Sequence, residues 1–175
     1  MARSGEVLAQ WINIELRSQQ LTLWRDSEAV FTRPVSTAAA GAGELNGSGG
    51  TPRGWHYIRA KIGANAPRAA VFRGRRATGE IWTPQLARQY PQRDWILSRI
   101  LWLCGLEPGF NRLGDVDTMR RFIYIHGCPD DEPLGVANSH GCVRMDNDSV
   151  MELFDLVDPG IKVWIGEGQP LNEED

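Results

Sequence analysis

Apolar and polar positions alternate in short runs through the first third of the chain. Residues 11–16 (Trp-Ile-Asn-Ile-Glu-Leu) and 21–24 (Leu-Thr-Leu-Trp) show the period of two that is typical of strands with one buried face. Polar residues 18–20 separate these runs, so the pattern predicts a β-hairpin. We expect a third strand at 29–32 and a fourth at 55–62, where the alternation resumes.

Two longer segments depart from this alternation. Residues 38–50 are rich in Ala, Gly, Ser and Asn, and with so few side chains to pack they are expected to form a mobile loop. Between 84 and 106 the spacing predicts one or two helices, interrupted at Pro91. The apolar residues that recur there at helical intervals are Leu86, Tyr90, Trp95, Ile96, Ile100, Leu101 and Leu103.

The last third returns to strands with one helix between them. Residues 122–125 are β-branched and aromatic, which predicts a buried strand that delivers His126 at its end. A helix should begin near Asp146 or Asn147, either of which can cap it, and end before Pro159. Residues 162–165 form the closing strand. We therefore predict one domain over 1–175 with its core at about 11–165, mainly β, a mixed sheet sandwich with a helical insertion and a helix after Cys142.

Composition allows a real core and excludes some partners. The 175 residues include 42% hydrophobic positions and seven tryptophans, most of which we expect in the core. The net charge of −3 leaves no general basic surface for nucleic acid. Arg73, Arg75 and Arg76 form a local basic run that we interpret as a solvated loop, with a patch for an anionic substrate as the alternative.

Cellular location is predicted from the termini and the cysteines. Residues 1–11 carry charge at Arg3 and Glu6 and lack the apolar stretch of a signal peptide. No run of about 18 apolar residues occurs anywhere, so no membrane span is expected. Three cysteines cannot all pair within one chain, which favours a reducing compartment. We expect a cytoplasmic protein, or a periplasmic one if the native N-terminus carries a signal that is absent here.

The residues suited to chemistry lie at 125–128 and 139–145. A cysteine is an effective nucleophile only as thiolate, so Cys142 needs a base within hydrogen-bond reach, and His126 at a strand end can supply it. Gly141 lets the backbone turn tightly and leaves room for a substrate carbonyl. A helix following Cys142 would favour the thiolate and an oxyanion. Arg144 offers a guanidinium fork for a carboxylate.

The run Ser139-His140-Gly141-Cys142-Val143-Arg144 resembles the Ser/Thr-His-Gly-Cys signature of L,D-transpeptidases of the YkuD type. His126-Gly127 and Leu134-Gly135 are similar to the block that precedes that signature. Thr51-Pro52-Arg53-Gly54 resembles the family's Thr-Pro-x-Gly block, so the resemblance extends from about Trp11 to Ile165.

This resemblance implies a YkuD-like fold and a two-step thiol mechanism without cofactor or metal. It implies that Cys142 is the nucleophile, His126 the base and His140 an orienting or structural group, with the Gly141 and Cys142 amides near the oxyanion. The implied substrate-binding residues are Arg144, Ser139, Gly141 and Gly127.

Family members cleave the diaminopimelate–D-Ala bond of peptidoglycan tetrapeptides and pass the acyl group to an amine or to water. Members without a leader resemble L,D-carboxypeptidases of muropeptide recycling, which we expect here. The implied partner is a peptidoglycan tetrapeptide or a free muropeptide, and L,D-transpeptidation is the alternative.

Other interpretations remain for these residues. Cys128 stands where the family usually has Thr or Ser, and it and Cys104 are expected to be packing residues, although Cys128 could be redox-sensitive. His56 is expected to be structural. The two His-x-Cys pairs could supply zinc ligands, but one intervening residue makes joint tetrahedral ligation awkward. A catalytically inactive wall-binding module is a further alternative.

Overall fold

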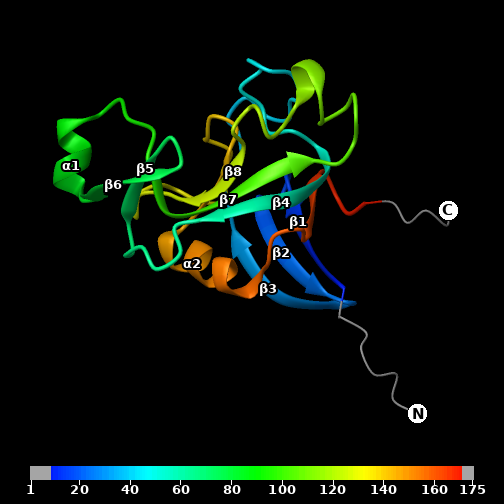
Figure 1. Ribbon diagram of the computed structural model, residues 1–175, viewed down its shortest axis with the longest axis horizontal. Coiled ribbons are helices and arrows are strands. Elements are labelled where there is room, and N and C mark those ends of the chain that lie inside the picture. Colours follow the sequence, from blue (N-terminus) through cyan, green and yellow to red (C-terminus); the bar gives the residue numbers. More distant parts are fainter. Residues whose placement is uncertain (1–8, 171–175) are drawn as a thin grey trace, which may run out of the picture.

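The computed structural model describes residues 9–170 and contains a mixed β-sheet with two α-helices and one short 3-10 helix (Figure 1). The strands are β1 Gln10–Glu15, β2 Gln20–Arg25, β3 Glu28–Pro34, β4 Gly54–Ile62, β5 Ala70–Arg73, β6 Arg76–Ile81, β7 Ile96–Gly105, β8 Tyr124–Gly127, β9 Val143–Met145 and β10 Lys162–Gly166. The helices are α1 Pro84–Gln89, α2 Asn147–Leu156 and the 3-10 turn η1 Gly114–Val116.

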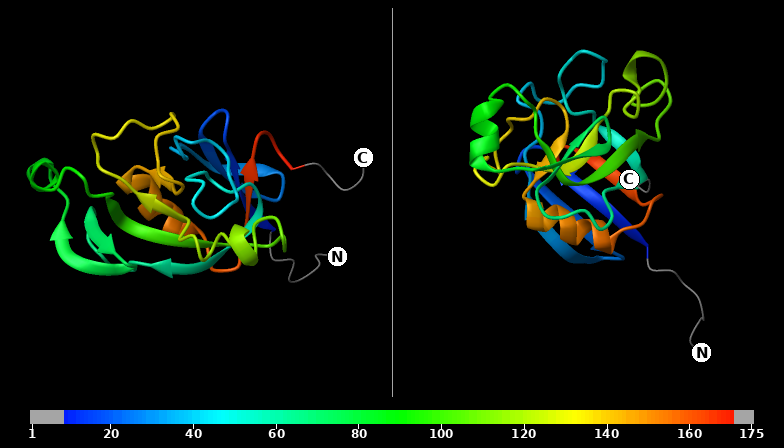
Figure 2. Two further views of the ribbon diagram at one scale, coloured as in Figure 1. Left: turned by 90° about the horizontal axis from the view of Figure 1, so that it is seen from above. Right: turned by 60° about the vertical axis from the view of Figure 1, so that its left-hand side comes forward.

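The strands described form one connected sheet in the order β3-β2-β1-β10-β4-β7-β5-β6, which branches at β7 to take in β8 and then β9. Two pairs are parallel, β1 with β10 and β8 with β9, and the other pairs are antiparallel. The sheet curves strongly (Figure 2). The mainly β prediction is confirmed, and the two layers of the expected sandwich are parts of this single curved sheet.

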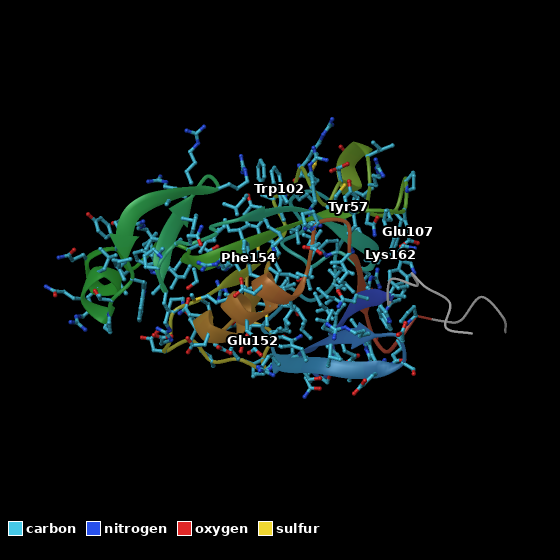
Figure 3. All side chains as sticks on the ribbon, turned by 60° about the horizontal axis from the view of Figure 1, so that its bottom comes forward. Tyr57, Trp102, Glu107, Glu152, Phe154 and Lys162 are labelled. Atoms are coloured by element: carbon cyan, nitrogen blue, oxygen red, sulfur yellow. The ribbon has the colours of Figure 1, made fainter. Side chains whose placement is uncertain are left out.

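The main core lies inside the curve. Ile12 and Ile14 of β1, Leu101 and Leu103 of β7 and Ile125 of β8 all belong to one cluster of buried side chains. Helix α2 adds Val150, Leu153 and Phe154 to the same cluster, and Figure 3 shows Phe154 between α2 and the central strands. Burial of each such side chain contributes about 1.5–3 kcal/mol. This packing fixes the central strands that carry the candidate site.

The N-terminal hairpin, the α2 cap and the closing strand agree with the sequence predictions. In β1 the even-numbered residues Ile12 and Ile14 face the core, and Trp11 lies on the opposite face. Helix α2 begins after Asp146, whose carboxylate accepts the Ser149 N–H at 2.8 Å. Strand β10 closes the sheet between β1 and β4.

The prediction that most tryptophans are core residues is wrong. Four of them form a half-buried row on the outer face of the sheet, with ring centroids 6.2, 5.9 and 5.3 Å apart along Trp24, Trp11, Trp55 and Trp164. Trp102 also lies on the face of β7 opposite Leu101 and Leu103 (Figure 3). The alternation of the strands places them there, because their neighbours in sequence occupy the core.

The predicted helical insertion at 84–106 is mostly wrong. Only Pro84–Gln89 is helical, capped by Thr83, and the chain leaves the helix at Tyr90 because the residue before a proline disfavours the α region. Residues 96–105 form the long central strand β7, which is buried along nearly its whole length. Apolar residues on both faces of a strand also fall at helical intervals, so the periodicity was ambiguous.

Three further strands, in addition to β7, were not predicted. β5 and β6 form a hairpin whose turn contains Gly74 and Arg75, so the basic run at 73–76 lies at a tight turn, with Arg73 and Arg76 exposed and Arg75 half-buried. β9 is a short strand paired with β8. Within residues 9–170 no helix is long and apolar enough to cross a membrane.

Candidate active site

Strands β8 and β9 bring together the two segments that the sequence marks as suited to chemistry, 125–128 and 139–145. They pair in parallel, with Ile125 opposite Val143 and His126 opposite Arg144. Cys142 directly precedes β9 and therefore lies beside Tyr124 at the start of β8. The cysteine and the histidine are thus positioned by neighbouring strands of a packed core.

The thiol of Cys142 is held by backbone groups of the segment that enters β8. The Tyr124 N–H donates to Cys142 Sγ at 3.4 Å, and the thiol lies 3.4 Å from the Phe122 carbonyl, to which it donates. Phe122 has a positive φ of 57°, a rare conformation for a side-chain-bearing residue. These contacts fix the direction from which Sγ meets a substrate.

The loop before Cys142 is tied by two hydroxyl groups. Ser139 Oγ donates to the Cys142 carbonyl at 2.5 Å and accepts the Gly141 N–H at 3.2 Å. Thr51 Oγ1 donates to the Gly141 carbonyl at 2.9 Å and accepts the Ala38 N–H at 3.0 Å. Ser139 therefore shapes the loop, and the Gly141 N–H that was expected near an oxyanion is already bonded to it.

Gly127 and Gly141 are required by space and backbone conformation. Gly141 has a φ of 134°, which side-chain-bearing residues rarely adopt. At Gly127 a Cβ would lie 2.5 Å from the Leu97 carbonyl oxygen and 2.7 Å from Asn147 Oδ1. Neither glycine lines the cavity described below, so the structure gives both of them roles in the backbone of the site.

His126 has a defined tautomer. Its Nδ1 lies 2.7 Å from the Gly127 carbonyl oxygen, which can only accept, so Nδ1 carries the proton. The ring is almost fully buried, and Nε2 is left as the nitrogen that can take a proton. A neutral imidazole in this tautomer is the form that a general base needs.

Cys142 and His126 line one cavity of about 390 Å³. Its other walls come from the β5–β6 turn, the segment 121–124 and the loop 139–144. The lining residues are Gly74, Arg75, Asp94, Ile96, Arg121, Phe122, Ile123, Tyr124, His126, Ser139, His140, Cys142 and Arg144. Five of the seven residues predicted for the site, the exceptions being the two glycines, therefore share one cavity.

The protonation states of the pair follow from burial. Burial, helped by the charge of Asp94, raises the pKa of the Cys142 thiol to about 12, against the lowering effect of the Tyr124 N–H, Arg144 and Arg121. Burial also lowers the pKa of His126, despite its bond to Gly127 and the charge of Asp94. At neutral pH the free site therefore holds a thiol and a neutral imidazole.

Arg144 is bonded to the protein. Its side chain is only 9% exposed, and one guanidinium nitrogen donates to Asp94 Oδ1 at 3.0 Å. Another donates to the Asn138 carbonyl at 3.2 Å. His140 is exposed, with Nδ1 3.5 Å from the second oxygen of Asp94. Asp94 thus contacts two residues of the loop 139–144, which we call the cysteine loop. Arg144 therefore supports that loop.

Helix α2 does not begin at Cys142. Strand β9 separates Cys142 from Asn147, the first helical residue, and Asp146 caps the helix N-terminus. Because a helix dipole acts mainly within its first turn, the expected help from α2 to the thiolate is not provided by this geometry. Asn147 instead supports β8, since its amide nitrogen donates to the Cys128 carbonyl at 2.9 Å.

The Gly-rich segment 38–50 lies against the cysteine loop. It contains no helix or regular strand, but Ala38 pairs with Ser139 and Ala42 with Thr51 in isolated bridges. Arg121 donates to the carbonyls of Gly43 at 2.9 Å and Gly50 at 2.7 Å. These contacts anchor both ends of the segment to the site.

The other predicted roles outside the cavity are structural. His56 is buried, with Nδ1 3.0 Å from the Gly54 carbonyl and Nε2 3.0 Å from Thr118 Oγ1. Cys104 and Cys128 are buried free thiols, and burial raises the pKa of Cys128 to about 12. Among residues 9–170 no three His, Cys, Asp or Glu side chains gather in a way that could hold a metal ion, so the zinc alternative has no ligand cluster.

Sequence reasoning missed Asp94, Thr51 and Tyr124 as members of the site. Asp94 follows a short helix in an irregular segment, and no motif marks it. Thr51 was noticed only as part of a block that resembles the family. Arg75 was noticed only as a member of a charged run.

Comparison with known proteins identifies the family. The family model of the L,D-transpeptidase catalytic domain (YkuD) matches residues 9–165. The chain belongs to the L,D-transpeptidase catalytic-domain family. A search of curated proteins found no match.

Solved structures show the same fold for this YkuD domain. An L,D-transpeptidase from Mycobacterium smegmatis is 16% identical to this chain with a TM-score of 0.54. The matched region covers 91% of this chain and 59% of the M. smegmatis chain. L,D-transpeptidase 3 from Mycobacterium tuberculosis is 16% identical with a TM-score of 0.56, covering 91% and 62%.

An L,D-transpeptidase from Xylanimonas cellulosilytica is 19% identical with a TM-score of 0.52, and covers 94% of this chain and 63% of its own. This YkuD domain therefore spans about three-fifths of the length of the solved structures that it matches.

Proposed function

We propose that this protein cleaves the bond between diaminopimelate and the terminal D-Ala of peptidoglycan tetrapeptides, with water as acyl acceptor. It is then an L,D-carboxypeptidase of muropeptide recycling. The observation that carries the proposal is the cavity of a YkuD-family domain in which the Cys142 thiol and His126 both form part of the wall. His126 keeps Nε2 for proton transfer because Nδ1 is bonded to Gly127.

The proposed reaction has two steps. As Cys142 Sγ attacks the diaminopimelate carbonyl, its proton passes to His126 Nε2, since the resting site holds a neutral pair. The C–N bond to D-Ala then breaks, and the imidazolium returns the proton to the departing amine. Water attacks the thioester with His126 again as base, which releases the shortened peptide and restores the thiol.

The oxyanion of each step needs donors other than the Gly141 N–H, which is bonded to Ser139. The Tyr124 N–H already reaches Cys142 Sγ at 3.4 Å and lies at the correct end of β8. We propose that it and the Cys142 N–H stabilise the developing charge.

Access of water supports hydrolysis. Two exposed side chains border the cavity, Phe122 with 51% of its surface exposed and His140 with 75% of its side chain exposed. Solvent therefore reaches the wall that carries Cys142. Hydrolysis needs no further binding site beyond this opening.

One observation favours transpeptidation as the second candidate function. A hollow of about 290 Å³ adjoins the Cys142 cavity and shares Asp94, His140 and Arg144 with it. Glu132 also lines this hollow, and Arg144 pairs with the carboxylates of both Asp94 and Glu132 there. The hollow would give an incoming acceptor space and polar groups next to the Cys142 cavity.

A defined tetrapeptide in ¹⁸O-labelled water tests both candidates. Under the proposal, mass spectrometry shows release of D-Ala and one ¹⁸O atom in the new carboxyl group of the tripeptide. If an added amine acceptor replaces the ¹⁸O label almost completely, transpeptidation is the function. Absence of D-Ala release, with Cys142→Ala as the baseline, contradicts both.

We also propose a cytoplasmic location. All three cysteines are free thiols, which is usual in a reducing compartment. Fractionation of the source cells with an antibody to the domain tests this, and detection only outside the cytoplasmic membrane would contradict it.

A further inference from the structure

Three arginines line the cavity, and two of them are committed to protein acceptors. Arg144 donates to Asp94 and to the Asn138 carbonyl and is nearly buried. Arg121 donates to carbonyls of the Gly-rich segment, including Gly43 and Gly50. Neither guanidinium can turn to a substrate without giving up these bonds and leaving buried donors unpaired, which is unfavourable.

Arg75 is different. It lies half-buried in the β5–β6 turn, and its guanidinium is stacked 4.7 Å from the Trp102 ring centroid and 4.9 Å from that of Phe122. Among residues 9–170, Arg75 makes one hydrogen bond, which its Nη1 donates to Tyr124 Oη at 3.0 Å. Stacking fixes the plane of the guanidinium while most of its N–H donors remain for a ligand.

The hydroxyl group of Tyr124 is a second hydrogen-bond donor beside the guanidinium of Arg75. Its oxygen accepts from Arg75, so its own hydrogen is left to point elsewhere. Burial raises the pKa of Tyr124, so the phenol stays protonated at neutral pH. The backbone N–H of the same residue reaches Cys142 Sγ, and Arg75 and Tyr124 both line the cavity that contains Cys142.

The charges of the cavity are divided between its walls. Asp94 is the acidic residue of the lining, and it is paired with Arg144 and close to His140. Arg75 lies on the wall made by the β5–β6 turn, without an acidic partner among the residues described. An anionic group entering the cavity is therefore favoured on the Arg75 side.

We propose that Arg75, together with the hydroxyl group of Tyr124, is the site that binds a carboxylate of the peptide substrate. This inference rests on the proposed function for the identity of that substrate. It gives the role of carboxylate binding to Arg75 and leaves Arg144 as a positioning residue for the cysteine loop.

A tetrapeptide stem offers two carboxylates near the scissile bond, that of the terminal D-Ala and that of the diaminopimelate side chain. Peptides in which one or the other is amidated separate these sources. We expect amidation of the recognised carboxylate to lower kcat/KM of the wild-type protein by about 10–100-fold. Equal kcat/KM for all three peptides would overturn the proposal.

Arg75→Gln tests the residue itself. It should lower kcat/KM for the acidic peptide by about 10–100-fold and leave the value for the matching amidated peptide almost unchanged. Tyr124→Phe should give a smaller loss with the same selectivity. Arg73→Gln is the matched control, since Arg73 is exposed on the same hairpin and does not line the cavity. Loss of activity on acidic and amidated peptides alike would show a merely structural role for Arg75 and overturn the proposal.

Alkylation of Cys142 gives a test that needs no peptide substrate. Iodoacetate carries a carboxylate and iodoacetamide does not, so the ratio of their rates at fixed pH measures attraction of an anion to the nucleophile. Arg75→Gln should lower this ratio about tenfold and Arg73→Gln should not change it. An unchanged ratio in Arg75→Gln overturns the proposal.

The two experiments also separate this inference from the proposed function. If no peptide is cleaved but the alkylation ratio depends on Arg75, the anion site is real and the proposed function is wrong. If the tetrapeptide is cleaved and neither its carboxylates nor the alkylation ratio depends on Arg75, the function stands and the site does not exist.

Discussion

The carboxylate of Asp94 accepts a hydrogen bond from the guanidinium of Arg144 at 3.0 Å, and its second oxygen lies 3.5 Å from His140 Nδ1. Asp94 comes from the segment between α1 and β7, so this contact joins distant parts of the chain at the cysteine loop. Its charge also acts on the proposed catalytic pair, because it raises the pKa of both Cys142 and His126.

Asp94→Asn should therefore move the acid limb of the kcat/KM profile to lower pH. Removing the negative charge lowers the pKa of His126, so the imidazole stays neutral at a lower pH. Because Asp94 is partly exposed, we expect a shift of about half a pH unit or less. Asp131→Asn removes an exposed charge outside the cavity and serves as control. A shift to higher pH would contradict the assignment.

Cys142→Ala and His126→Gln should each lower tetrapeptide cleavage by at least about a thousandfold, because each removes a group that takes part directly in the bond changes. Circular dichroism checks that the fold is retained. Cys128→Ala should keep activity within about threefold, since that thiol is buried outside the cavity. Retained cleavage in Cys142→Ala would refute the mechanism.

The pH dependence of alkylation should show that the resting cysteine is a thiol. With the pKa of Cys142 raised to about 12, the rate with iodoacetamide should rise about tenfold per unit from pH 6 to pH 9. In contrast, kcat/KM should level off above the pKa of His126, which lies below the ordinary histidine value. An alkylation rate that is already constant at pH 6 would indicate a preformed thiolate instead.

Thr51→Val should lower kcat without a matching rise in KM. The valine keeps the shape of the side chain but removes the hydroxyl that joins the Ala38 N–H to the Gly141 carbonyl, so the cysteine loop loses its anchor. We expect about a tenfold loss of kcat and a loss of about 1–3 kcal/mol in the free energy of unfolding. Thr32→Val, at an exposed position of β3, should change neither value. A rise in KM alone would point to substrate contact by Thr51.

His56 should make the fold sensitive to acid. Burial lowers its pKa to about 4, whereas in the unfolded chain the imidazole has its ordinary value of 6.5. As pH falls from 6.5 to 4 the unfolded state takes up the proton first, so the free energy of unfolding should fall by about 3 kcal/mol from this group. Urea unfolding at several pH values measures the loss, and NMR of the His56 ring gives its midpoint. A midpoint near 6.5 would contradict the prediction.

The sequence predicted β1 from its alternation, and it predicted β8 from β-branched and aromatic residues although every residue of β8 is buried. In β1 the isoleucines alternate with Trp11 and Asn13, and that period of two cannot be mistaken for a helix. In β7 residues on both faces are buried, so the alternation disappears. Leu101 and Leu103 belong to the main core with α2, and Ile100 belongs to a second cluster with Phe72 and Tyr124. Strand β9 was not predicted because its three residues are too few to show a period of two.

By itself, the sequence determined the family and indicated the segment of the proposed nucleophile, because Ser139-His140-Gly141-Cys142 is a local motif. Only the tertiary structure decided what surrounds Cys142. In the sequence, Arg144 is an arginine near a motif and Arg75 is one of a charged run, and nothing local shows which of them is free to bind a ligand. They differ in the residues from distant segments that contact them. Asp94 pairs with the guanidinium of Arg144. Trp102 and Tyr124 contact the guanidinium of Arg75 and leave most of its N–H groups free to bind a ligand. Such pairings depend on how the strands meet in space, and no local pattern records them.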